Sequence, residues 1–210
     1  MRSFKTAFPT EFLHPYQAGT MGYTYKGIAC LKDPIDLAIF TKLVWDLRPG
    51  TLIEIGSNRG GSALWFADQL SAVGLKCPVL SIDLQPPDIA DPRIEFLAGD
   101  AARLGECLSQ FRLTPLAHPW LVVEDSAHLF SVTKAAIRFF ADTMRTGDVL
   151  VVEDGVIDDL GLTVSYDGGP NRAVAEFIAA DPGTFRVTKE YCDMFGTNAT
   201  YNPNGYLVRL

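Results

Sequence analysis

Apolar residues gather in five short runs that are separated by longer stretches of mixed polarity. The runs are rich in β-branched residues and have the length of strands. They cover residues 51–55, 77–83, 93–99, 119–124 and 148–153. Continuous apolar runs predict strands that are buried on both faces, because these strands have no solvent-facing side to alternate with. Residues 93–99 differ, because apolar and polar residues alternate there. Two closing strands are predicted at residues 185–191 and 206–210.

Helical patterns lie between these runs. Asp33 and Pro34 provide an N-cap and a first-turn proline, and Pro49 with Gly50 ends the helix that they begin. The other helices are expected at residues 62–73, 101–111, 131–144 and 171–180. Alternating strands and helices predict an α/β fold with a parallel sheet and helices on both faces.

Two stretches do not follow this pattern. Residues 1–30 contain several aromatic residues without regular spacing, and we expect them to form an N-terminal cap that contributes to the substrate site. Residues 155–170 are rich in glycine and aspartate, which is typical of a lid or substrate loop. Residues 31–210 are expected to form the main domain.

Composition and charge limit the class of partner. The chain has 210 residues and a net charge of −7, which disfavours nucleic acid and anionic membranes. We find neither an uncharged run of transmembrane length nor the apolar core of a signal peptide. The four cysteines are scattered without metal-ligand spacing, as in reduced proteins. We therefore expect a cytoplasmic protein with a small-molecule substrate; a homo-oligomer is compatible with the sequence.

The run at residues 51–55 leads into a glycine-rich turn with Gly56, Gly60 and Gly61. A strand, glycine turn and helix expose backbone N–H groups to a ligand. The turn has neither the GxGxxG spacing of a dinucleotide site nor the GxxxxGK[ST] spacing of a phosphate loop. Asp83 ends the next strand, where it can accept hydrogen bonds from a ribose. Each feature alone fits a structural turn or a solvated acid equally well, but together they favour S-adenosylmethionine.

Three carboxylates are expected at the ends of two neighbouring strands: Asp125, Glu153 and Asp154. Adjacent strands are about 5 Å apart, so these groups would converge and favour a divalent cation over an acidic rim paired with basic residues. All-oxygen ligation selects Mg²⁺. His128 follows Asp125 by three residues, and we consider it as a general base, a metal ligand or a structural residue.

The chain resembles the cephalosporin hydroxylase/rhamnosyl O-methyltransferase family. The resemblance covers residue 26 to the end and depends on seven motifs in order. They are K-x-P-x-D (residues 32–36), E-x-G-x-x-x-G-G-S-A (54–63), I-D (82–83), D-S-x-H (125–128), V-E-D (152–154), G-P-x-x-A-V (169–174) and, more loosely, T-x-N-P-x-G-Y-L (200–207).

This resemblance implies a Rossmann-like class I methyltransferase, with a seven-stranded, mostly parallel sheet whose last strand is antiparallel. It implies metal-assisted O-methylation of a hydroxyl on a sugar, natural product or catechol-like diol, with Mg²⁺ at Asp125, Glu153 and Asp154 and with His128 and Asp125 in catalysis. The methyl donor is expected at Glu54, Gly56, Ser57, Gly60, Gly61, Ser62, Asp83, Leu84, Asp100 and Ala101. A non-catalytic nucleoside-binding protein and an NAD-dependent oxidoreductase are the alternatives.

Overall fold

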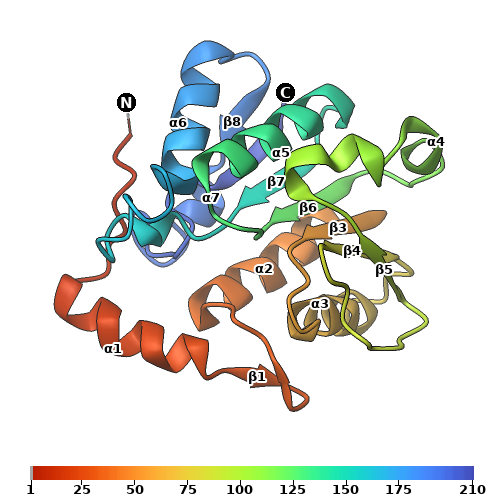
Figure 1. Ribbon diagram of the computed structural model, residues 1–210, viewed down its shortest axis with the longest axis horizontal. Helices are drawn as coiled ribbons and strands as arrows, with labels where there is room; N and C mark the ends of the chain where they lie inside the picture. Colours follow the sequence, from red (N-terminus) through yellow and green to blue (C-terminus); the bar gives the residue numbers. More distant parts are fainter. Residues whose placement is uncertain (1) are drawn as a thin grey trace.

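The centre of the computed structural model, which describes residues 2–210, is a seven-stranded sheet (Figure 1). Its strand order is β5-β4-β3-β6-β7-β9-β8, and β9 runs antiparallel between β7 and β8. The strands are β3 (Thr51–Ile55), β4 (Val79–Asp83), β5 (Ile94–Ala98), β6 (Trp120–Glu124), β7 (Val149–Val152), β8 (Phe185–Val187) and β9 (Tyr206–Arg209). The predicted mostly parallel sheet with an antiparallel last strand is confirmed.

Helices cover both faces of this sheet, as predicted (Figure 1). One face packs on α2 (Pro34–Leu47) and α3 (Gly61–Ala72), and the other on α5 (Phe130–Thr143) and α6 (Gly169–Ala180). Successive residues of a strand alternate between the two cores: Leu52 belongs to the first, and Ile53 to the second. Burial on both faces explains why the strands are continuous apolar runs.

Local signals set the boundaries of α2. The side chain of Asp33 accepts a hydrogen bond from the Ile35 N–H at 3.2 Å, and Pro34 occupies the first turn. The helix ends at Arg48, whose φ of 49° is left-handed. The inward face buries Ile39 and Leu43 completely, in the spacing that the sequence shows.

The structure differs from the predicted elements at three places. The N-terminal segment contains a helix, α1 (Thr10–Met21), which has Pro15 inside it and buries Leu13 and Thr20. Residues 101–111 form a 3₁₀ helix, η1 (Ala101–Glu106), and the short α4 (Gln110–Leu113), with non-helical Arg103 inside η1. Strand β8 ends at Val187, and α7 (Lys189–Cys192) replaces the rest of the predicted strand; the Thr188 hydroxyl between them donates a hydrogen bond to the Tyr206 carbonyl at 3.0 Å.

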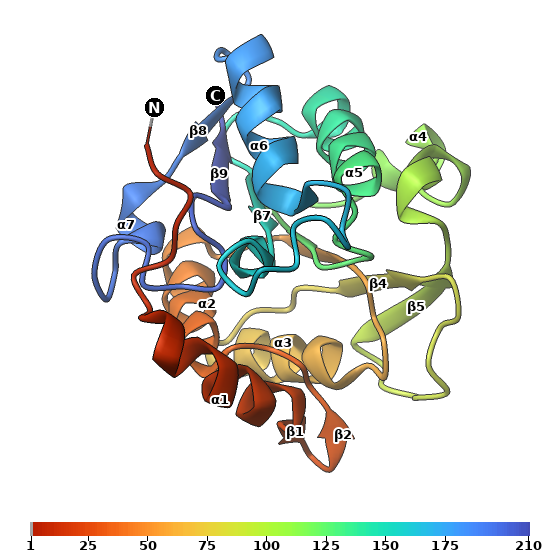
Figure 2. The same cartoon turned by 60° about the vertical axis from the view of Figure 1, so that its left-hand side comes forward.

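A third, smaller apolar cluster joins α1 to the loop of residues 155–168, which we call the lid. Leu13 of α1 packs with Val156 and Tyr201, and Phe8 and Leu160 complete the contact. The lid begins with the 3₁₀ helix η2 (Gly155–Ile157). A two-stranded hairpin, β1 (Thr24–Tyr25) and β2 (Ile28–Ala29), then connects α1 to the body (Figure 2).

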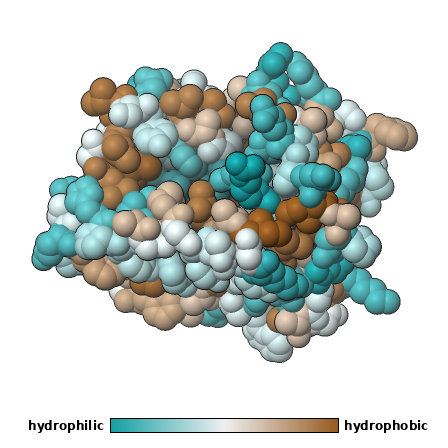
Figure 3. Space-filling model, turned by 60° about the horizontal axis from the view of Figure 1, so that its bottom comes forward, coloured by the Kyte–Doolittle hydropathy of each residue, from teal (hydrophilic) through white to brown (hydrophobic). Residues whose placement is uncertain are grey.

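The described residues include no helix that is long and apolar enough to cross a membrane. The face in Figure 3 shows apolar patches bordered by polar residues. All four cysteines are free thiols, and Cys30, Cys77 and Cys192 are buried. Trp65 and Phe66 of α3 belong to the core, as the sequence indicates.

A substitution at Gly61 tests whether the end of the glycine turn must lack a side chain in order to pack against β2. A Cβ at this position would lie 2.2 Å from the Ala29 carbonyl oxygen of β2. We expect Gly61→Ala to lower the free energy of unfolding by about 1–3 kcal/mol, measured by urea denaturation. Gly19→Ala is the control: nothing lies within 4 Å of that Cβ, and the helix should gain up to about 1 kcal/mol. Equal stability of the two variants would contradict the packing role.

Candidate functional site

A cavity of about 790 Å³ lies where the parallel strands β3, β4, β6 and β7 end. The chain leaves β3 toward β4 on one side and returns to β6 on the other, so this is the point where the strand order reverses. Ligands bind at such a reversal in open α/β sheets, because the loops after the two central strands separate there. The cavity has a turn-lined end, an acidic end and a roof.

The glycine turn forms one end of the cavity and is tightly packed. Gly56 has a φ of +104°, and a Cβ there would lie 2.0 Å from the Asp125 carbonyl oxygen. Glycine is therefore required at this position. Asp83 accepts hydrogen bonds from the N–H groups of Asn58 (2.9 Å) and Gln85 (3.1 Å), which fix its carboxylate at the cavity wall.

Most of the residues predicted to hold the donor line this cavity. They are Gly56, Ser57, Ser62, Asp83, Leu84, Asp100 and Ala101. The structure places the other three outside the lining. Glu54 is fully buried and accepts a hydrogen bond from the Ser81 hydroxyl at 2.5 Å, whereas Gly60 and Gly61 face packed neighbours.

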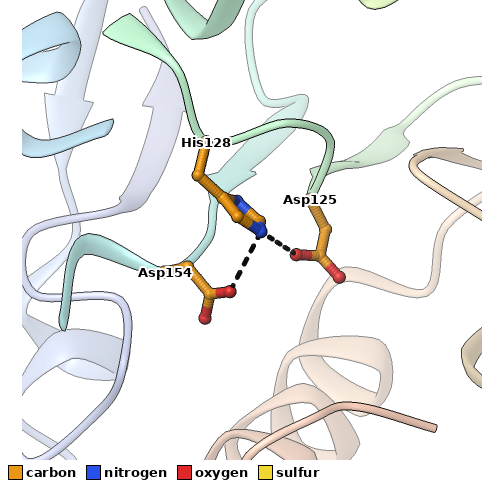
Figure 4. A group of neighbouring side chains, drawn as sticks. All are labelled: Asp125, His128 and Asp154. Carbon is orange, nitrogen blue, oxygen red and sulfur yellow. Dashed lines mark ion pairs between the residues drawn. The ribbon is translucent and has the colours of Figure 1, made fainter. Parts of the chain in front are cut away.

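The acidic end of the cavity brings together Asp125, His128 and Asp154 (Figure 4). One ligand atom from each lies within 4.8 Å of the others, and His128 Nε2 is 3.3 Å from Asp154 Oδ2 and 3.9 Å from Asp125 Oδ1. His128 and Asp154 have left-handed φ values of 56° and 59°. Non-glycine residues rarely adopt this conformation, and it concentrates at functional sites.

Glu153, the third predicted ligand, lies outside this group. Its carboxylate is buried, and Oε1 is 2.7 Å from Lys32 Nζ. The same ammonium is 2.5 Å from Asp125 Oδ2. Glu124 is also buried and is hydrogen-bonded to Ser126, so it faces the body, as the strand alternation indicates.

The sequence analysis missed Lys32 as a residue of the site. Burial opposes its charge, but Asp125, Glu153 and Glu54 outweigh this and raise the pKa of Lys32 well above its ordinary value. The Lys32 ammonium is thus held between two carboxylates. The available signal was the K-x-P-x-D motif, which begins at Lys32.

The ionisation of His128 is set by opposing effects. Burial favours the neutral ring, but the nearby carboxylates of Asp154, Asp125 and Glu124 raise its pKa above the ordinary value. A ring in this position can accept a proton or donate nitrogen electrons to a cation. Its Nδ1 is buried without a hydrogen-bond partner among the described residues.

These residues fit a divalent cation. Asp125 and Asp154 offer carboxylate oxygens, and Mg²⁺ is commonly held by one or two carboxylates while it keeps several waters. If His128 is a third ligand, the mixed oxygen and nitrogen set also suits Mn²⁺ and other transition metals.

The model of the family "Rhamnosyl O-methyltransferase/CmcI" matches residues 18–210. The chain belongs to this family of O-methyltransferases.

Curated members of the family include the rhamnosyl O-methyltransferase of Mycobacterium leprae, which is 29% identical over 192 residues, 89% of this chain and 82% of that protein. The Mycobacterium tuberculosis enzyme is 26% identical over 209 residues, 95% of this chain and 84% of that protein.

Solved structures share the fold. CmcI with Mg and SAM has a TM-score of 0.67 at 24% identity, covering 100% of this chain and 90% of that chain. Apo CmcI has a TM-score of 0.70 at 24% identity, covering 100% and 89%. The MycE methyltransferase with Mg, SAH and mycinamycin VI has a TM-score of 0.51 at 17% identity, covering 70% and 44%. The class I methyltransferase fold predicted from the sequence is thereby confirmed.

Two late motifs of this rhamnosyl O-methyltransferase/CmcI family member support the acidic end. The Asn202 side-chain oxygen accepts a hydrogen bond from the Asp154 N–H at 2.8 Å, which holds the left-handed backbone there. Asn171 donates to the Gly155 carbonyl (2.7 Å) and to Asp158 (2.8 Å), which fixes the start of the lid. The late motifs therefore position the loop that carries Asp154 and begins the lid.

The roof of the cavity consists of α1 and the lid. Gln17 and Met21 come from α1, and Leu160, Leu162 and Tyr166 from the lid. The Tyr166 ring lies 5.9 Å from the His128 ring. Both stretches that lacked a regular pattern in the sequence thus meet above the acidic end.

Asn202→Ala tests whether the Asn202 side chain holds the backbone at Asp154 in place. The substitution leaves the Asp154 N–H without its acceptor, so we expect the free energy of unfolding to fall by about 1–3 kcal/mol. Added Mg²⁺ should also raise the melting temperature less than it does in wild type. Thr197→Ala, at an exposed neighbour, should change neither quantity. An Asn202 variant with wild-type stability and Mg²⁺ response would exclude this role.

Proposed function

We propose that this protein is an S-adenosylmethionine-dependent, Mg²⁺-assisted O-methyltransferase acting on a hydroxyl of a sugar or natural product. The proposal depends on one observation. A single cavity has the glycine turn and Asp83 at one end, which suit a nucleoside, and the Asp125/Asp154 pair at the other end. The family membership and the SAM- and Mg-bound neighbours support this combination.

Gly56, Ser57, Asp83 and Asp100 would hold the donor. Asp83 is aimed by two backbone N–H groups and has acceptor capacity left for ribose hydroxyls. Asp100 is fixed in a similar way, because it accepts a hydrogen bond from the Ala102 N–H at 2.9 Å. When it is bound, S-adenosylmethionine supplies an electrophilic methyl group.

Asp125 and Asp154 would hold the cation, which lowers the pKa of a bound hydroxyl. His128 lies against both carboxylates and would take up the hydroxyl proton at Nε2 or serve as a third ligand. Glu153 stays a proposed ligand, and in that role its carboxylate would have to turn from Lys32 toward the cavity. The acceptor oxygen would then face the methyl group across the cavity.

The N-terminal cap of residues 1–30 would contact the acceptor. Gln17 and Met21 of α1 line the cavity on the side of the lid. The apolar lid residues Leu160 and Leu162 would exclude water from the reacting atoms. The four free thiols support a reducing, cytoplasmic location.

Asp83→Ala tests the donor site. Loss of the two hydroxyl hydrogen bonds to this carboxylate should weaken S-adenosylhomocysteine binding about 10–100-fold in calorimetry. Asp88→Ala removes an exposed carboxylate from the loop that follows and should bind as wild type does. Equal affinity of the two variants would place the donor elsewhere.

Asp154→Asn tests the cation site and separates an enzyme from a binding protein. Asparagine tolerates the left-handed backbone, so the fold should be retained. Methyl transfer to a panel of rhamnosides and catechols, followed by S-adenosylhomocysteine release, should fall about 100-fold or more. Chelation of Mg²⁺ from wild type should have the same effect and be reversed by readdition.

Donor affinity of Asp154→Asn should stay close to wild type, because Asp154 lies at the other end of the cavity. Asp142→Asn, an exposed variant on α5, is the matched control for activity. Full turnover of chelated wild type would eliminate metal assistance.

A further inference from the structure

Lys32 occupies an unusual position between two carboxylates of the proposed cation site. It precedes α2, its side chain is 1% exposed, and it also lines the cavity. Its ammonium contacts Asp125 Oδ2 at 2.5 Å and Glu153 Oε1 at 2.7 Å. Asp125 directs its other oxygen toward His128 and the proposed cation.

The charge balance of this cluster depends on Lys32. The Lys32 ammonium lies 2.5 Å from an oxygen of Asp125 and 2.7 Å from an oxygen of Glu153, so its positive charge offsets part of the negative charge that the carboxylates place beside the cavity. The same ammonium repels a divalent cation that binds nearby.

We propose that Lys32 is a resident counter-cation of the metal site, which holds the carboxylates of Asp125 and Glu153 in place and lowers the site's affinity for the divalent cation. It is a positioning residue, since it acts through Asp125 and Glu153. This inference rests on the proposed metal-assisted function. A cation that the protein holds loosely gains more of its binding energy from the acceptor oxygens. Binding of the cation and binding of the acceptor therefore strengthen each other.

Lys32→Met removes the charge and keeps the length of the side chain. The local charge becomes more negative by one unit, and we expect the Kd for Mg²⁺ to fall about 10-fold or more. Calorimetry on metal-free protein, with neither donor nor acceptor present, measures this directly. A lysine that only supported the fold would give the opposite result, because its loss would disorder Asp125 and weaken the binding of Mg²⁺.

Two further variants keep the test decisive. Lys42→Met removes a positive charge from the exposed side of α2, where Lys42 pairs with Asp46, and should leave the Kd unchanged. Lys32→Arg keeps the positive charge between the two carboxylates. Its Kd for Mg²⁺ should stay within about threefold of wild type.

The melting temperature provides a second readout if Lys32→Met is unstable without metal. Loss of the ammonium leaves the buried Glu153 without its partner and destabilises the metal-free fold, so saturating Mg²⁺ should raise the melting temperature more in this variant than in wild type. A smaller rise in melting temperature, or a Kd for Mg²⁺ equal to or above that of wild type, overturns the proposed role of Lys32 but leaves the proposed metal assistance standing. If neither protein binds Mg²⁺, both this role and the proposed metal assistance are wrong.

Discussion

The buried ion pair of Lys32 with Asp125 and Glu153 is the interaction on which the site depends. It joins the segment before α2 to the ends of two neighbouring strands, β6 and β7. Glu153 would otherwise be a carboxylate without a partner in a low-dielectric interior, and breaking such a pair is strongly destabilising. The pair also orients Asp125, which leaves one of its oxygens free to face the cavity.

The two ends of the cavity are linked through Asp125. Its N–H donates to the Ile55 carbonyl at 2.8 Å, and its own carbonyl lies against the α-carbon of Gly56. The proposed donor turn and the first proposed cation ligand therefore belong to one packed unit at the point where the strand order reverses. A methyltransferase requires this proximity, because the methyl group and the acceptor oxygen have to meet in line.

The sequence predicted the sheet well because doubly buried strands are continuous apolar runs, as in residues 51–55. It missed α1, since a helix that buries little beyond Leu13 has no regular apolar face and depends on contacts with the lid. At the site, spacing alone suggested that Glu153 and Asp154 face the same way. The left-handed backbone at Asp154 and the buried Lys32 separate them, and neither effect can be read from strand alternation.

The central claim is that Asp125 and Asp154 hold a divalent cation beside a bound methyl donor. A crystal structure with S-adenosylhomocysteine and Mn²⁺, analysed by anomalous scattering, tests it most directly. We expect one manganese peak at about 2.0–2.3 Å from an oxygen of each carboxylate, with the nucleoside at Asp83. Manganese bound away from both carboxylates, or a nucleoside outside the Gly56–Asp83 end, would contradict it.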